Sequence, residues 1–106
     1  MPQYIFAYHG GKKPETEEEG AKDMAAWMAW FEKMGDAVDI PGNPVGMSKT
    51  VSAQGVADNG GANPLSGFTV IKADSIEAAC EVAKGCPMVA DGSGSVEVAE
   101  VIEMEM

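Results

Sequence analysis

The chain has 106 residues, of which 17 are acidic and seven basic, so its net charge is −10 at neutral pH. This length suits one domain with a modest core, and we expect a single domain over residues 1–106. The acidity argues against nucleic acid and anionic membranes as partners, because clustered basic residues must neutralise their negative charge. The first residues lack the basic and apolar regions of a signal peptide, so we expect a cytoplasmic protein.

The first predicted elements are a strand and a helix. Residues 3–9 alternate as a strand does, and one face carries Tyr4, Phe6 and Tyr8. Residues 15–19 fit the start of the following helix, where negative charge meets its positive dipole end. Gly20 weakens this first turn, so the main part of the helix is predicted over residues 21–34. The helix has an apolar stripe made of Met24, Trp27, Met28, Phe31 and Met34. Trp27 is therefore predicted in the core, and Trp30 at the stripe's edge, where it walls a pocket or fills a dimer seam.

The middle of the chain alternates between short extended pieces and loops. Residues 36–40 are predicted to be extended, and two prolines and a glycine make residues 41–44 an irregular loop. Residues 47–54 are predicted to form a strand with one wholly polar face, which is typical of an edge strand or of a wet lining. A Gly- and Asn-rich loop is expected over residues 55–64.

The strongest local signals predict a strand over residues 67–73 and a helix directly after it. Asp74 is placed as the helix N-cap, with Glu77 three residues later as in a capping box. Gly85 marks the end of this helix. Its apolar stripe consists of Ile76, Ala79, Cys80 and Ala83.

A last strand is predicted over residues 95–104, and Glu100 falls among its apolar residues. Either Glu100 lies in a partly apolar site, or a twist or bulge lets it reach water or pair with Lys72.

The predicted order β-α-β-β-α-β indicates an α+β, ferredoxin-like fold, in which two helices cover one face of a four-stranded antiparallel sheet. The other face would stay uncovered, and a broad apolar sheet face rarely remains exposed on a soluble monomer. We therefore expect a homodimer that packs through the uncovered sheet faces.

Several segments together resemble the YCII-related (DGPF-type) domain family. They are YIFAY at residues 4–8, WMAWFEKMG at 27–35, PGNP at 41–44, SGFTVIKADSIEAA at 66–79, GCP at 85–87 and VEV at 96–98. The resemblance implies a dimeric α/β barrel. Members of this family are mostly of unassigned function, and a few act on chlorinated aromatic breakdown products.

Some relatives are thought to use a His–Asp pair whose histidine lies on the first helix. The present chain departs from this pattern, because its first helix holds no histidine. The DGPF stretch is also replaced, by DNGGANPL at residues 58–65. The resemblance therefore does not transfer the pair to this chain.

His9 is the only histidine, and it lies where the first strand meets a glycine turn. It is a candidate general base in a lyase or isomerase, with Asp36 or Asp39 to orient it and Glu100 to assist. The other hypothesis is a non-catalytic module that binds a small apolar or aromatic ligand in a cleft between subunits. The residues expected to line this cleft are Tyr8, His9, Trp30 and Glu100.

Metal ligands are too few for a site, because the chain has one histidine and two cysteines six positions apart, Cys80 and Cys86. We expect no metal and no cofactor.

Overall fold

The computed structural model describes residues 1–104. Its strands are β1 (Gln3–Gly10), β2 (Val38–Ile40), β3 (Thr50–Ser52), β4 (Gly55–Ala57), β5 (Leu65–Lys72) and β6 (Gly94–Glu100). Its helices are α1 (Glu17–Met34), α2 (Ile76–Ala83) and α3 (Pro87–Ala90), with a 3-10 turn, η1 (Gly35–Ala37), directly after α1.

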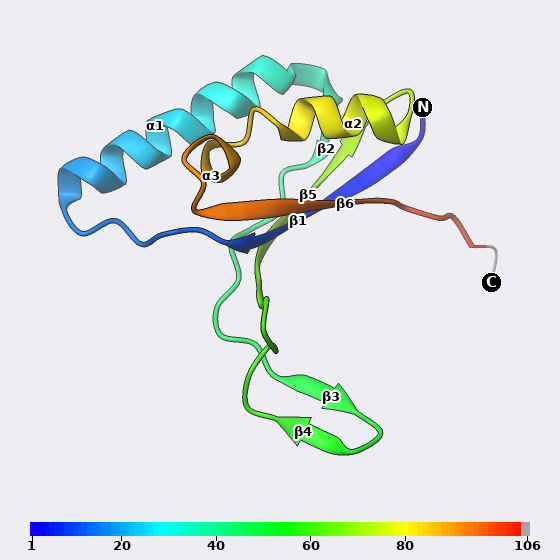
Figure 1. Cartoon of the computed structure of the whole chain (residues 1–106). Coiled ribbons are helices and arrows are strands. Elements are labelled where there is room, and N and C mark those ends of the chain that lie inside the picture. The colour runs from blue at the N-terminus through cyan, green and yellow to red at the C-terminus, as the bar shows by residue number, and fades with distance from the viewer. Residues whose placement is uncertain (105–106) are drawn as a thin grey trace.

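Four strands form an antiparallel sheet in the order β2-β5-β1-β6. The first and third strands of the β-α-β-β-α-β plan lie in the centre, which is the ferredoxin-like arrangement. All helices cover the same face of this sheet (Figure 1). The fold class predicted from the sequence is confirmed.

α1 begins within the segment predicted to fit its start, whereas the cap of α2 differs from the prediction. α1 starts at Glu17, because the hydroxyl of Thr16 accepts a hydrogen bond from the N–H of Glu19 and caps the first turn. Gly20 therefore stays helical. The predicted cap of α2 is wrong by one residue, since the hydroxyl of Ser75, and not Asp74, accepts from the N–H of Ala78.

The predicted strand at residues 47–54 shortens to β3, which does not join the main sheet. β3 pairs only with β4, a strand that lies inside the loop expected at residues 55–64. β2, in the piece expected to be extended at 36–40, takes the sheet edge instead. In Figure 1 the β3–β4 hairpin projects on the side of the sheet opposite the helices.

The core lies between the sheet and the helices, and Trp30 is at its centre. The side chain is 5% exposed, and its ring stacks on Phe6 with centroids 6.0 Å apart. The indole N–H donates to the carbonyl of Val82, so α1 packs toward α2 as well as toward the sheet. Because α1 packs toward α2 as well, its buried stripe does not include Met24 and Met28, which are 66% and 64% exposed.

The predicted roles of the two tryptophans are therefore reversed. Trp30 belongs to the core, whereas Trp27 is half-buried and packs against the core from outside. On α2 the predicted stripe holds at Ala79 and Ala83, which are buried, but Ile76 and Cys80 are exposed.

β6 ends at Glu100, four residues before the predicted end. The N–H of Val101 still donates to the carbonyl of Gln3. Beyond Gln3, β1 offers only Met1 and Pro2, and proline has no N–H to continue the ladder. The next apolar residues, Ile102 and Met104, are accordingly 69% and 77% exposed.

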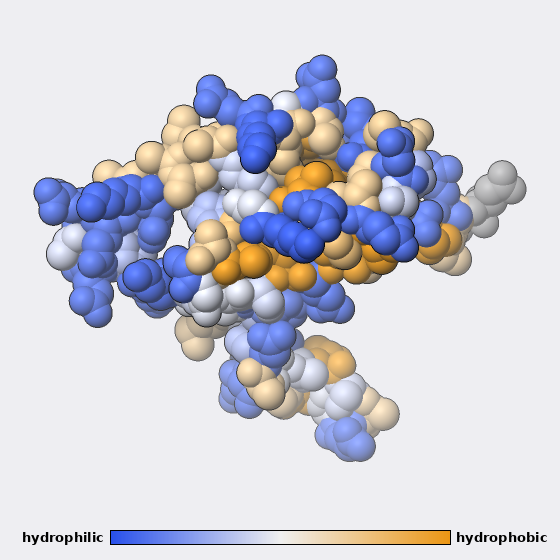
Figure 2. All heavy atoms as spheres, turned by 45° about the horizontal axis from the view of Figure 1, so that its top comes forward, coloured by the Kyte–Doolittle hydropathy of each residue, from blue (hydrophilic) through white to orange (hydrophobic). Residues whose placement is uncertain are grey.

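The second face of the sheet has no helix over it. The alternation of β1 places Ile5 and Ala7 there, and the registers add their partners Phe68, Val70 and Ala99. In the helix-side view of Figure 2, the most hydrophobic residues gather in a band along the sheet, while moderately hydrophobic residues are exposed along α1 and hydrophilic ones gather at its start.

Candidate functional site

A cavity of about 730 Å³ lies between α1 and the end of the sheet where β1 finishes and β5 begins. Its size is in the usual range for sites that take small organic molecules. The lining comes from β1, α1, α3, β5 and two loops: Tyr8, Met24, Trp27, Phe31, Met88, residues 10–14, residues 41–44 and residues 66–69.

Aromatic rings form one wall of this cavity. Trp27 meets Tyr8 edge to face, with ring centroids 5.1 Å apart, and lies 6.4 Å from Phe31 in a stacked arrangement. The i, i+4 spacing of Trp27 and Phe31 places both on the face of α1 that looks toward the sheet. Such a wall presents flat apolar surface to a ligand.

A chain of hydroxyl groups runs along the sheet side of the cavity. The hydroxyl of Tyr8 donates to Thr69 Oγ1 at 2.7 Å, and Thr69 in turn donates to the carbonyl of Pro41 at 2.9 Å. Burial raises the pKa of Tyr8 well above its ordinary value, so the phenol stays protonated at neutral pH. Tyr8 is therefore a hydrogen-bonding group here and not a base.

Ser66 adds an unsatisfied polar atom to the lining. Its buried hydroxyl oxygen has no hydrogen-bond partner within residues 1–104. A buried hydroxyl without a partner is costly to the folded protein.

His9 lies on the other face of the sheet and does not line the cavity. Its Nδ1 is 2.9 Å from the carbonyl oxygen of Asn63, and its Nε2 is 3.0 Å from Oε1 of Glu97. The side chain of His9 is 12% exposed and that of Glu97 is 71% exposed.

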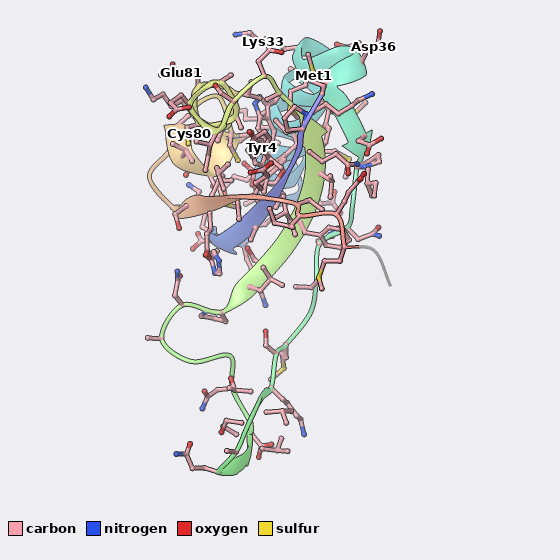
Figure 3. The ribbon with its side chains drawn as sticks, turned by 90° about the vertical axis from the view of Figure 1, so that its right-hand side faces the viewer. Met1, Tyr4, Lys33, Asp36, Cys80 and Glu81 are labelled. Atoms are coloured by element: carbon pink, nitrogen blue, oxygen red, sulfur yellow. The ribbon has the colours of Figure 1, made fainter. Side chains whose placement is uncertain are left out.

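Asp36 does not accompany His9, contrary to the hypothesis from the sequence. It belongs to η1, which ends directly before Val38, and Val38 pairs with Ile71 toward the end of β5, whereas His9 pairs with Leu65 at the start of β5 (Asp36 is labelled in Figure 3). The carboxylate that contacts His9 is Glu97. The antiparallel register of β1 and β6 explains this pair. Glu97 is opposite Ala7, two residues before His9, so Glu97 and His9 are diagonal neighbours on the same face of the sheet.

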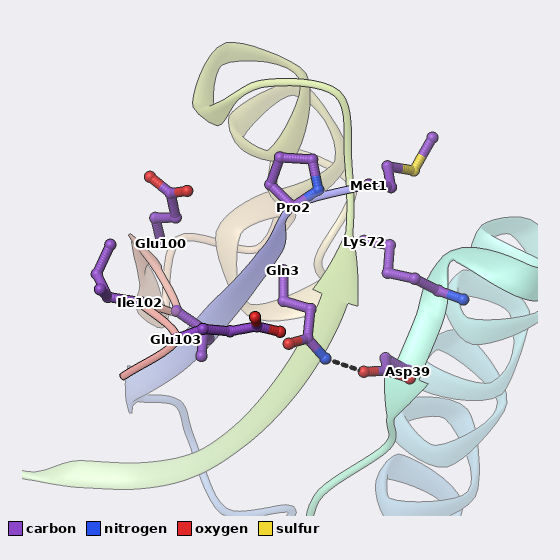
Figure 4. A pocket seen from close by; sticks show the side chains of 9 residues that line it. Met1, Pro2, Gln3, Asp39, Lys72, Glu100, Ile102 and Glu103 are labelled. Atoms are coloured by element: carbon purple, nitrogen blue, oxygen red, sulfur yellow. Dashed lines mark hydrogen bonds between the residues drawn. The ribbon is translucent and has the colours of Figure 1, made fainter. Parts of the chain in front are cut away.

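A second hollow, of about 680 Å³, lies beside the start of β1 and the end of β6 (Figure 4). Polar and apolar groups share its wall about equally, and Gln3 donates a hydrogen bond to Asp39 there. Glu100 and Lys72 both line this hollow. Glu100 is exposed, so its carboxylate reaches water and is not held in an apolar site.

The four residues expected to form one ligand site are thus dispersed. Tyr8 lines the larger cavity, Trp30 lies in the core, His9 occupies the uncovered sheet face, and Glu100 lines the second hollow. Sequence reasoning missed Phe31, although its apolar i, i+4 spacing from Trp27 was visible as a helical stripe.

The part of the chain that the structure describes contains no group of three or more His, Cys, Asp or Glu side chains placed to hold a metal ion. No helix within residues 1–104 is both long and apolar enough to cross a membrane.

The sequence model of the YCII-related domain family matches residues 4–105. No curated protein sequence matches the chain significantly. Among solved structures, the chain is similar to 5-chloro-2-hydroxyhydroquinone dehydrochlorinase from Burkholderia phenoliruptrix, in its complex with 2,5-dihydroxybenzoquinone. The TM-score is 0.59 at 15% identity, over 98% of this chain and 96% of the other, which shows a shared fold. The family match over nearly the whole sequence shows that this chain belongs to the YCII-related domain family.

Proposed function

We propose that this protein is a homodimer that binds a small, largely apolar or aromatic molecule in the cavity beneath α1. The observation that carries the proposal is a cavity of about 730 Å³ with an aromatic wall and a few hydrogen-bonding groups. The similar dehydrochlorinase holds a small ring compound in its complex, which agrees with this ligand class. The proposed site is within one chain, and not in the inter-subunit cleft expected from the sequence.

A neutral fluorescent probe tests the site. We expect N-phenyl-1-naphthylamine to bind saturably, and the Trp27→Ala variant to bind it about tenfold more weakly, because the variant loses much of the aromatic wall. Fluorescence titration measures both affinities. Met28→Ala is the matched control, since Met28 is on the same helix, 64% exposed and outside the lining.

Equal binding by the Trp27→Ala variant and the wild type would contradict the proposed site. Because Trp27 also packs against the core, Trp27→Phe provides a check on folding. We expect this variant to keep most of the affinity, since a flat ring remains in the wall.

The uncovered sheet face supports the homodimer, since Ile5, Ala7, Phe68 and Ala99 lie on it and are half-buried or exposed. Two such faces packed together would remove this apolar surface from water, as in an isologous dimer. The net charge of −10 opposes association at low salt, so burial has to overcome this repulsion.

Sedimentation tests the dimer. We expect the wild type to sediment as a dimer at micromolar concentration and the Ile5→Asp variant as a monomer, because a carboxylate at the centre of the face would be buried without a partner. Ile102→Asp is the control, as Ile102 lies past the end of β6 and is 69% exposed. A monomeric wild type would contradict the proposal.

The alternative function, proton-transfer catalysis, is favoured by one observation, the contact of His9 with Glu97 at 3.0 Å. A histidine held by a carboxylate is a common arrangement for a general base. Chloride release from 5-chloro-2-hydroxyhydroquinone, the compound named for the similar dehydrochlorinase, provides an assay. Release by the wild type and loss in His9→Ala would support catalysis, whereas no release by either protein would count against it.

A further inference from the structure

We infer that the ligand of the α1 cavity is an organic anion, whose negative group is bound by Lys12 and Lys13 and whose apolar body lies against the aromatic wall. This inference rests on the proposed binding function of the same cavity and adds the chemical class of the ligand.

The charge of the lining carries the inference. The chain has 17 acidic and seven basic residues, yet the charged residues that line the cavity are Lys12 and Lys13. None of the carboxylates within residues 1–104 lines it. An acidic protein thus surrounds a site whose own formal charge is positive, and this contrast favours a negative ligand group there.

Both lysines are exposed lining residues, so they lie at the opening of the cavity. Neither forms an ion pair with a carboxylate of the described residues. Their ammonium groups are therefore available to an anion that enters from solvent, and their flexible stems let them adjust to its position.

Glu19 and Asp91 have hydrogen-bond partners of their own. Glu19 accepts a hydrogen bond from the N–H of Glu15 at the start of α1. Hydrogen bonds from Ser93 lower the pKa of Asp91, and Lys12 contributes weakly to the same shift. Asp91 therefore offsets part of the charge of Lys12.

Ser66 lines the cavity, but its hydroxyl is buried beneath the lining and lacks a partner in the described residues, so it is not an exposed donor for the ligand. Carboxylate, sulfonate and phenolate groups all suit the two lysines, since each presents an anionic oxygen. The cavity thus combines an aromatic wall for a flat body with cationic donors at its opening for an anionic group.

A matched pair of probes tests the inference. 1-Anilinonaphthalene-8-sulfonate and N-phenyl-1-naphthylamine share one ring skeleton, and only the first carries a negative charge. In the Lys12→Gln/Lys13→Gln variant we expect the anionic probe to bind about tenfold more weakly and the neutral probe to change by less than about twofold. Raising the salt concentration should weaken wild-type binding of the anionic probe alone.

Lys22→Gln/Lys33→Gln is the control, because it changes the net charge equally and removes two exposed lysines of α1 outside the lining. We expect it to leave both affinities unchanged. If the control weakens the anionic probe as much as Lys12→Gln/Lys13→Gln does, the effect is one of net charge and the inference is overturned.

The outcomes also separate the inference from the proposed function. If Trp27→Ala weakens the neutral probe while Lys12→Gln/Lys13→Gln leaves the anionic probe unaffected, the inference fails and the binding function stands. If neither probe binds saturably, the proposed function fails and the inference fails with it.

Discussion

Replacing Trp30 by alanine is expected to lower the free energy of unfolding by about 3–5 kcal/mol. The side chain is 5% exposed, and its ring stacks on Phe6 at 6.0 Å. Its indole N–H donates a hydrogen bond to the carbonyl of Val82 in α2, so the variant also loses this hydrogen bond between α1 and α2. Urea unfolding followed by circular dichroism measures the change.

Met28→Ala removes an apolar side chain from the same helix and is the control for Trp30→Ala. Met28 is 64% exposed, so we expect a change within about 0.5 kcal/mol. Similar changes in the free energy of unfolding for the two variants would contradict the packing of α1 on the sheet through Trp30.

Replacing Gly42 by alanine is expected to cost about 2–3 kcal/mol and to weaken binding of N-phenyl-1-naphthylamine. Gly42 has φ +73°, and a Cβ atom there would lie 1.8 Å from the carbonyl oxygen of Phe68. That oxygen belongs to the backbone of β5, so the loop at residues 41–44 must move away from the sheet. The loop lines the cavity, and the movement should change the cavity's shape.

Gly46→Ala provides the comparison for Gly42→Ala. Gly46 has no positive φ, and a Cβ atom there would have no neighbour within 4 Å. We expect this variant to have the same free energy of unfolding and the same affinity for the probe as the wild type. A Gly42→Ala protein with wild-type stability and affinity would show that the loop does not need its close approach to β5.

Local signals were sufficient to predict most of the scaffold. The alternation of Tyr4, Phe6 and Tyr8 predicted that these residues share one face of β1, and the structure buries all three. The element order predicted the ferredoxin-like sheet. These features depend on residues close in the chain, which is why one sequence was enough for them.

Features that depend on packing between distant elements were predicted less well. The helical period of α1 did not distinguish Trp27 from Trp30, because the buried face also depends on the position of α2. The contact of His9 with Glu97 joins residues 88 positions apart and requires the register of β1 with β6. Likewise, predicting the β3–β4 hairpin required knowing which strand pairs at the edge of the main sheet.

The candidate site was largely beyond sequence reasoning for the same reason. The cavity brings together parts of β1, α1, α3, β5 and two loops. Tyr8 was predicted as a ligand residue and does line it, but Lys12 and Lys13 looked like ordinary loop lysines until the structure placed them at its opening.

The most direct test of the proposed function is a ¹H–¹⁵N NMR titration of the wild-type protein with N-phenyl-1-naphthylamine. Binding beneath α1 predicts saturable shifts of the Trp27 indole N–H and of the Gly10 and Gly42 amides, with Glu97 and Ala99 on the far side unaffected. Shifts confined to Glu97, Ala99 and their neighbours on the uncovered sheet face, or no saturable shifts at all, would contradict a ligand site in this cavity.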